Sequence, residues 1–116
     1  MKQAILDTDT VSYYFRDHTK VIEKIDTYLV EHGFVHISVV TYYEIMNGLM
    51  YKDARRQLAK FERFVRLNNV IPLTLTSAKV AAGIYANLRK TGKPIGHNDV
   101  MIAGIAIDND LVLVPK

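Results

Sequence analysis

Short apolar runs alternate with longer segments of helical periodicity along the whole chain. The runs are only a few residues long and are rich in β-branched residues, which is typical of buried strands. Pro72 lies inside the third run and predicts an edge strand or a strand end, because proline cannot donate to a sheet ladder. The predicted strands are residues 4–6, 34–40, 70–73 and 111–114.

The segments between these runs carry apolar residues at intervals of three and four, the spacing that predicts amphipathic helices. In the first of them, Gly33 follows the last apolar residue and gives a helix stop signal. The last segment is apolar on nearly all sides, which predicts a central helix. The predicted helices are residues 20–30, 41–49, 53–67, 77–92 and 98–109.

This alternation of strands and helices predicts the fold class. Strands that are joined by helices form right-handed crossovers, so the strands run parallel and helices cover both faces of the sheet. We therefore expect a three-layer α/β/α fold around a central parallel sheet of about four strands. No repeat or linker-like tract divides residues 1–116, which predicts a single domain.

Composition narrows the class of protein only moderately. The chain has no cysteine, which excludes disulfides and thiolate metal sites and favours an intracellular, cytoplasmic location. No apolar run approaches the roughly 18 to 20 residues of a membrane span. The formal net charge of +3 is compatible with a polyanionic partner but does not identify one.

Three positions place carboxylates beside apolar segments rather than on polar faces. Asp7 follows the first strand, with Asp9 two residues later, Glu44 lies early in the helix after the second strand, and Asp99 opens the last helix. Functional groups of parallel sheets gather at the carboxyl ends of strands, so we expect these acids to converge there. Clustered carboxylates repel one another unless a cation offsets them, and oxygen ligands suit Mg²⁺ or Mn²⁺.

Each acid also has an explanation that needs no chemistry. Asp7 and Asp9 belong to a residue type that turns favour. Thr41 and Glu44 match the Thr-x-x-Glu capping box of a helix start. Asp99 is a residue that capping and the helix dipole select in the first turn. Each signal alone is weak, and the metal-site hypothesis rests on their joint placement.

The same aspartate pair also fits the opening signature of aspartate-nucleophile phosphatases of the haloacid dehalogenase-like type. In that hypothesis Asp7 is the nucleophile, Asp9 the acid or base, and Ser38 a phosphate contact. The chemistry then needs a later lysine and a strand that ends in paired acids. Neither residues 70–73 nor residues 111–114 end in an acid, so this hypothesis is the weakest of those considered.

Three segments together resemble the PIN domain, and more closely the VapC-like ribonuclease toxins of prokaryotic toxin–antitoxin pairs. They occur in the family's order and at similar separations, so the resemblance covers essentially the whole chain. The last segment is the most specific, because it combines Gly96, Asp99 and an apolar helix before a Leu-Val-rich strand. The segments are ILDTDTVSYYF, ISVVTYYEIMNGL and GKPIGHNDVMIAGIAIDNDLVLV.

The resemblance implies a PIN-like fold, a divalent metal at the acidic sheet edge, and endonucleolytic cleavage of RNA. It implies that Asp7, Glu44 and Asp99 are the catalytic and metal-binding acids, and that Asp9 supports them where many members carry asparagine. Mg²⁺ (or Mn²⁺) would be held by Asp7 and Asp99, and Glu44 would orient or deprotonate the attacking water. It further implies an antitoxin partner and a homodimer.

The chain departs from the family pattern after the fourth strand. Members usually continue into Thr-x-Asn or Thr-x-Asp, which supplies a fourth polar or acidic group, whereas Pro115 and Lys116 stand here. The sequence fits a shortened chain, a truncated gene product or an unusual natural ending. We expect weaker metal binding and a less covered sheet edge. A catalytically impaired PIN-like interaction module is therefore the alternative function.

Basic and aromatic residues add hypotheses about partners. Arg89, Lys90 and Lys93 precede the Asp99 segment and are candidates to hold RNA, although cations near a helix C-terminus also complement its dipole. Basic residues between positions 52 and 66 predict a solvated helix face, with a phosphate-binding stripe as the alternative. Aromatics near the acids fit core packing, a groove for an antitoxin peptide, or base stacking. They are Tyr13, Tyr14, Phe15, Tyr42 and Tyr43.

Overall fold

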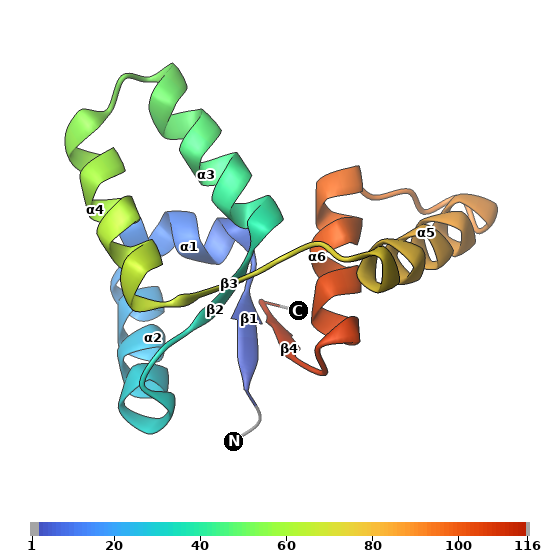
Figure 1. Cartoon of the computed structure of the whole chain (residues 1–116), viewed down its shortest axis with the longest axis horizontal. Coiled ribbons are helices and arrows are strands. Elements are labelled where there is room, and N and C mark those ends of the chain that lie inside the picture. The colour runs from blue at the N-terminus through green and yellow to red at the C-terminus, as the bar shows by residue number, and fades with distance from the viewer. Residues whose placement is uncertain (1–2, 116) are drawn as a thin grey trace.

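The computed structural model describes residues 3–115, and Figure 1 shows a central sheet with helices on either side. Strands and helices alternate as the hydrophobic pattern predicts, except for one additional helix directly after the first strand. The strands are β1 (Ala4–Leu6), β2 (His36–Ser38), β3 (Asn69–Ile71) and β4 (Val112–Val114). The helices are α1 (Thr8–Phe15), α2 (Thr19–His32), α3 (Val39–Tyr51), α4 (Arg55–Leu67), α5 (Leu75–Lys90) and α6 (His97–Asp108).

The four strands are all parallel and follow the spatial order β3-β2-β1-β4. In β1, Leu6 pairs with Ile37 of β2 on one side and with Val114 of β4 on the other. Helices α1 to α4 lie on one side of the sheet in Figure 1, and α5 and α6 lie on the other. The predicted α/β/α fold with a four-stranded parallel sheet is confirmed. Pro72 was predicted to mark an edge strand or a strand end, and β3 is an edge strand that ends directly before Pro72.

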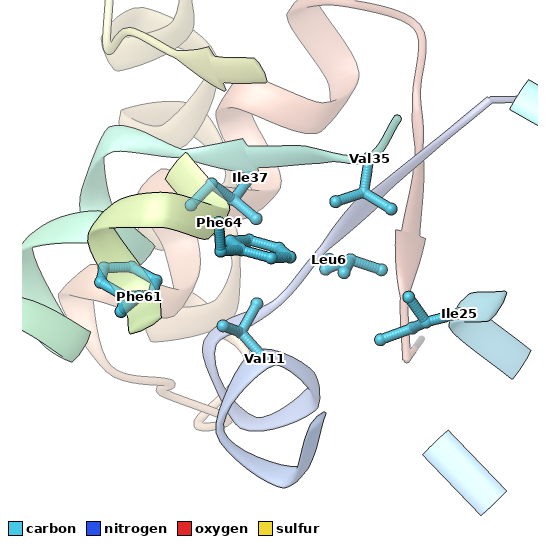
Figure 2. Packing of buried hydrophobic residues seen from close by; sticks show 7 residues of the cluster. All are labelled: Leu6, Val11, Ile25, Val35, Ile37, Phe61 and Phe64. Atoms are coloured by element: carbon cyan, nitrogen blue, oxygen red, sulfur yellow. The ribbon is translucent and has the colours of Figure 1, made fainter. Parts of the chain in front are cut away.

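One face of the sheet buries a core that α1, α2 and α4 complete. Figure 2 shows Leu6 and Ile37 of the sheet together with Val11, Phe61 and Phe64 of the helices. Phe61 is fully buried, and its ring centroid lies 6.2 Å from that of Phe64. Burying one such side chain contributes about 1.5–3 kcal/mol to folding. Three of the aromatics near the acids pack against this core, as predicted, and they are Tyr14, Phe15 and Tyr42.

The opposite face of the sheet packs against α6, which is the central helix that its sequence predicts. Ile5 of β1 and Ile71 of β3 share a second core with Ile102 and Ile105 of α6. All four side chains are buried. Because β1 contributes Leu6 to the first core and Ile5 to this one, the strand is covered on both faces, as a strand inside a parallel sheet should be.

Helix α5 packs on the outer side of α6 through small residues. A Cβ atom placed on Gly104 of α6 would lie 2.6 Å from the carbonyl oxygen of Ser77 and 2.9 Å from the Cβ of Ala81. Glycine at position 104 therefore allows the two helices to approach more closely than a side chain would permit.

The second strand is shorter than its apolar run predicts. It ends at Ser38, and the two valines that follow already belong to α3. The hydroxyl of Ser38 accepts a hydrogen bond of 3.0 Å from the backbone N–H of Thr41, so Ser38 is the N-cap of α3. The predicted capping box of Thr41 and Glu44 is therefore wrong, because the helix begins at Val39, two residues before Thr41.

The additional helix α1 begins directly after Asp7, in the stretch for which a turn is the alternative interpretation. Asp7 is its N-cap, and the Asp7 Oδ1 atom accepts a 2.8 Å hydrogen bond from the backbone N–H of Thr10. The turn interpretation of Asp7 and Asp9 is therefore wrong in detail, since Asp9 lies in the first turn of a helix. Lys116, on which part of the C-terminal prediction rests, lies outside the described residues.

Helices of the length and apolar character that a membrane span requires are not found within residues 3–115.

We predict that Gly104→Ala destabilises the protein, because the added methyl group must push α5 away from α6. Overpacking of this kind costs about 1–3 kcal/mol, measurable as a lower urea midpoint. The matched control is Gly83→Ala on α5, where an added Cβ meets nothing within 4 Å. Alanine at that position should stabilise the helix by about 0.5–1 kcal/mol. A Gly104→Ala variant as stable as Gly83→Ala would contradict this packing.

Candidate active site

Asp7 stands at the carboxyl edge of the sheet, between β1 and α1. Its backbone N–H donates a 2.7 Å hydrogen bond to the carbonyl oxygen of Val114, which extends the pairing of β1 with β4 by one residue. Its side chain caps α1 through Thr10. The first contact holds the backbone of Asp7 and the second holds its side chain, so the sheet and the helix together set the position of the carboxylate.

The electrostatic surroundings of Asp7 disfavour its negative charge. Burial raises the pKa of the Asp7 carboxyl, and hydrogen bonds from the backbone and side chain of Thr10 oppose that effect. The charges of Asp9 and Asp99 raise the pKa further. Both acids are therefore close enough to Asp7 for their charges to act on its carboxyl group.

Glu44 is held from two sides in the second turn of α3. Its Oε1 atom accepts a 2.6 Å hydrogen bond from the hydroxyl of Thr8, which is the first residue of α1. Its Oε2 atom accepts a 3.3 Å hydrogen bond from the side-chain amide of Asn98, in the first turn of α6. Because Thr8 adjoins Asp7 and Asn98 adjoins Asp99, these contacts bring Glu44 to the same edge as the two aspartates.

Asp99 is exposed in the first turn of α6. The N-cap of this helix is Gly96, which has no side chain to cap it. A Cβ atom on Gly96 would lie 3.6 Å from the Oδ2 atom of Asp99, an ordinary contact distance. Asp99 therefore contributes an accessible carboxylate at the start of a helix, where the helix dipole favours negative charge.

The chemistry of these donors fits a hard divalent cation. Within residues 3–115, histidine, cysteine, aspartate and glutamate do not form a group of three arranged to hold a metal ion. The candidate ligands Asp7 and Asp99 nonetheless offer only oxygen atoms. The negative charge of Asp99 also raises the pKa of Asp7, so the two carboxylates repel each other. A cation between them would offset this repulsion, so these two carboxylates could hold Mg²⁺ or Mn²⁺.

The three basic residues proposed to contact RNA are all exposed. Arg89 and Lys90 lie in the last turn of α5, and Lys93 lies in the connection to α6. Figure 1 shows that α5 runs away from the sheet and that the connection returns to the start of α6. Their role in RNA binding stays a prediction.

Polar residues that sequence reasoning did not assign to the site surround Glu44. Thr8 and Asn98 donate to its two oxygen atoms, and the buried hydroxyl of Thr41 lies 3.0 Å from that of Thr8. Ser38, considered only as a phosphate contact, caps α3 instead. The sequence does contain one indication that Thr8 and Asn98 belong to the site, because each lies directly beside a candidate acid.

We predict that Asp7→Asn raises the stability of the metal-free protein at neutral pH. The folded state raises the pKa of Asp7, so it binds that proton more tightly than the unfolded chain does. Protonated Asp7 therefore stabilises the folded protein at low pH, and this contribution is lost as the pH rises through the pKa of Asp7 in the folded state. Asparagine keeps an acceptor for the cap on α1 but carries no charge.

Urea unfolding in EDTA should therefore give a higher midpoint for Asp7→Asn than for the parent protein at pH 7.5. The difference should shrink as the pH is lowered and the aspartate of the parent protein becomes protonated. A parent protein that is the more stable of the two at pH 7.5 in EDTA would refute this account.

Comparison with known proteins places this geometry in a family. The family model described as PIN domain matches residues 4–116. Ribonuclease VapC1 of Haemophilus influenzae (strain R2866) is 29% identical over 115 residues, which cover 95% of this chain and 83% of that protein. The tRNA(fMet)-specific endonuclease VapC of Shigella flexneri is 29% identical, covering 98% of this chain and 86% of that protein.

A solved structure shows the same arrangement of strands and helices. The DNA-bound VapBC structure from Salmonella typhimurium superimposes with a TM-score of 0.85 at 29% identity, covering 97% of this chain and 85% of that chain. Because the family model spans nearly the whole sequence and the fold agrees, this chain belongs to the PIN domain family.

Proposed function

We propose that this protein is a metal-dependent endoribonuclease and the toxin of a toxin–antitoxin pair. Its main support is a set of contacts at the carboxyl edge of the sheet, where the charge of Asp99 acts on Asp7 and donors on α1 and α6 hold Glu44. Similarity to proteins named ribonuclease VapC1 and tRNA(fMet)-specific endonuclease VapC supports RNA as the substrate.

In this proposal Asp7 and Asp99 hold Mg²⁺ or Mn²⁺, directly or through water. When bound, the cation would polarise the scissile phosphate and activate a water molecule for attack. Glu44 orients that water or accepts its proton, and a carboxylate that is held in place is suited to either role. Asp9, which is close enough for its charge to act on Asp7, supports the site by orienting the ligands or a water molecule.

RNA would be held by cations as well as by the acidic edge. Arg89, Lys90 and Lys93 are exposed and follow one another at the end of α5 and the start of the next connection. Each cation that neutralises a phosphate adds affinity that does not depend on sequence and that falls with salt.

The antitoxin would dock over the groove between α1, α2 and α4. This groove encloses about 370 Å³, and Phe15, Ile22, Phe64 and Leu67 line its apolar part. Charged side chains from α2 and α4 lie around it, so it suits the apolar face of an amphipathic helix. Similarity to the VapBC structure supports an antitoxin of this kind as the partner.

We also propose that the protein forms a homodimer and is located in the cytoplasm. Apolar side chains of α3 that face solvent support self-association, with Tyr43 62% exposed, Met50 61% exposed and Tyr51 91% exposed. The cytoplasm is the compartment in which a toxin that cuts RNA meets its substrate.

A second candidate function is a PIN-like module that binds its partner without cleaving RNA. The observation that favours it is Pro115, which follows β4 directly at the position where the resemblance expects a threonine and then a fourth polar group. A proline side chain has no hydroxyl group, so it cannot supply the hydrogen bond that a threonine would make at this position.

A cleavage assay separates the two functions. We predict that the purified protein cuts structured RNAs in Mg²⁺ or Mn²⁺, and that Asp7→Asn and Asp99→Asn each lower the rate by about 100-fold or more. The matched control is Asp26→Asn, the same change at an exposed position of α2. It should cut at the rate of the parent protein.

Cleavage that persists in both site variants would refute the acidic-site hypothesis and point to a contaminating nuclease. Failure of the parent protein to cut, together with retained binding of an amphipathic antitoxin-like peptide, would favour the interaction module.

A further inference from the structure

Three hydroxyl groups form a chain behind Glu44. The Ser38 Oγ atom lies 3.3 Å from Thr41 Oγ1, which lies 3.0 Å from Thr8 Oγ1, which in turn lies 2.6 Å from Glu44 Oε1. Ser38 and Thr41 are both 0% exposed, so water does not compete for these contacts. The chain connects the end of β2, the start of α3 and the start of α1.

The number of available protons means that the hydrogen bonds between these three hydroxyls and Glu44 can run in only one direction. An ionised carboxylate has no proton, so Thr8 must donate to Glu44. Each hydroxyl carries one proton, and Thr8 has used its own, so Thr41 must donate to Thr8. By the same count, Ser38 donates to Thr41, while the Ser38 oxygen accepts the backbone N–H of Thr41. All three O–H bonds therefore run toward the carboxylate.

We propose that Ser38, Thr41 and Thr8 form an oriented hydroxyl relay that fixes the carboxylate of Glu44 for catalysis, with Thr41 as its central positioning residue. The catalytic part of this inference rests on the proposed ribonuclease function. Hydrogen bonds that run in one direction polarise one another and strengthen the last bond of the chain. The final bond to Glu44 is the shortest of the three, as expected when a hydroxyl donates to a charged acceptor.

The relay also determines which acceptor sites of Glu44 stay available. A carboxylate offers about four acceptor sites on its two oxygen atoms. Thr8 uses one on Oε1, and Asn98 uses one on Oε2. The carboxylate is thus held at both oxygen atoms and still has sites left to bind a water molecule, which is the task that the proposed mechanism gives it.

Substitution of Thr41 tests the relay, because valine has the shape of threonine without the hydroxyl. We predict that Thr41→Val lowers kcat for RNA cleavage by about 10- to 100-fold and leaves KM unchanged, as loss of a residue that orients a ligand does. Thr41→Ser keeps the hydroxyl and should restore kcat. The pair Thr8→Val and Thr8→Ser should behave alike and serves if Thr41→Val does not fold.

The matched control for lost stability is Ser77→Ala. Ser77 is also 0% exposed, and its hydroxyl belongs to the capping box of α5, away from Glu44. This variant should lower the urea midpoint but leave kcat unchanged. An unchanged kcat in a folded Thr41→Val variant would overturn the positioning role.

A measurement on the metal-free protein decides the relay without any cleavage assay. We expect the hydroxyl proton of Thr8 to exchange slowly with water in proton NMR, and Thr41→Val should abolish that protection and shift the side-chain carboxyl carbon resonance of Glu44. Ser77→Ala should change neither signal. If Thr41→Val leaves both the exchange of the Thr8 hydroxyl proton and the Glu44 carboxyl resonance unchanged, the relay is overturned. If both change in Thr41→Val but the parent protein cuts no RNA, only the proposed function is refuted.

Discussion

The pairing of β1 with both β2 and β4 is the interaction on which the candidate site depends. Parallel strands end at one edge of a sheet, so this pairing puts Asp7 and Ser38 at the same edge. The bond from the Asp7 backbone to Val114 continues the pairing to the point where α1 begins. Because α1 and α3 both start there, Thr8 and Glu44 come within hydrogen-bonding distance.

The surroundings of the two acids Glu44 and Asp7 at this edge differ. Glu44 has two hydrogen-bond donors, whereas the carboxylate of Asp7 is raised in pKa by burial and by two neighbouring acids. The two donors hold the orientation of Glu44, whereas the surroundings of Asp7 oppose its negative charge. The cost at Asp7 is tolerated because the apolar cores on the two faces of the sheet hold β1 in place whatever the charge at its end.

Periodic features of the sequence predicted most of the fold. The strands and the longer helices follow from spacing, and Gly33 ends α2 in the left-handed conformation that a helix stop requires, with φ of 83°. Helix α1 was missed because it has only eight residues and follows a strand without an intervening loop. The start of α3 was misplaced because Ser38 and Thr41 are both good capping residues and only packing decides between them.

The candidate site was predictable to the extent that it depends on position in the chain. Asp7, Glu44 and Asp99 each adjoin the end of a strand or the start of a helix, which sequence can indicate. The hydroxyl chain behind Glu44 and the close approach at Gly104 join residues far apart in sequence. Such contacts depend on tertiary packing, for which a single sequence contains no direct signal.

The two donors to Glu44 come from opposite ends of the chain, and this has a consequence during synthesis. Thr8 leaves the ribosome early, whereas Asn98 and Asp99 belong to α6, which is made late. A nascent chain that already contains β1, β2 and α3 therefore carries Asp7 and Glu44 without the residues that complete the edge. The order of translation therefore leaves the acidic edge incomplete until most of the polypeptide has emerged.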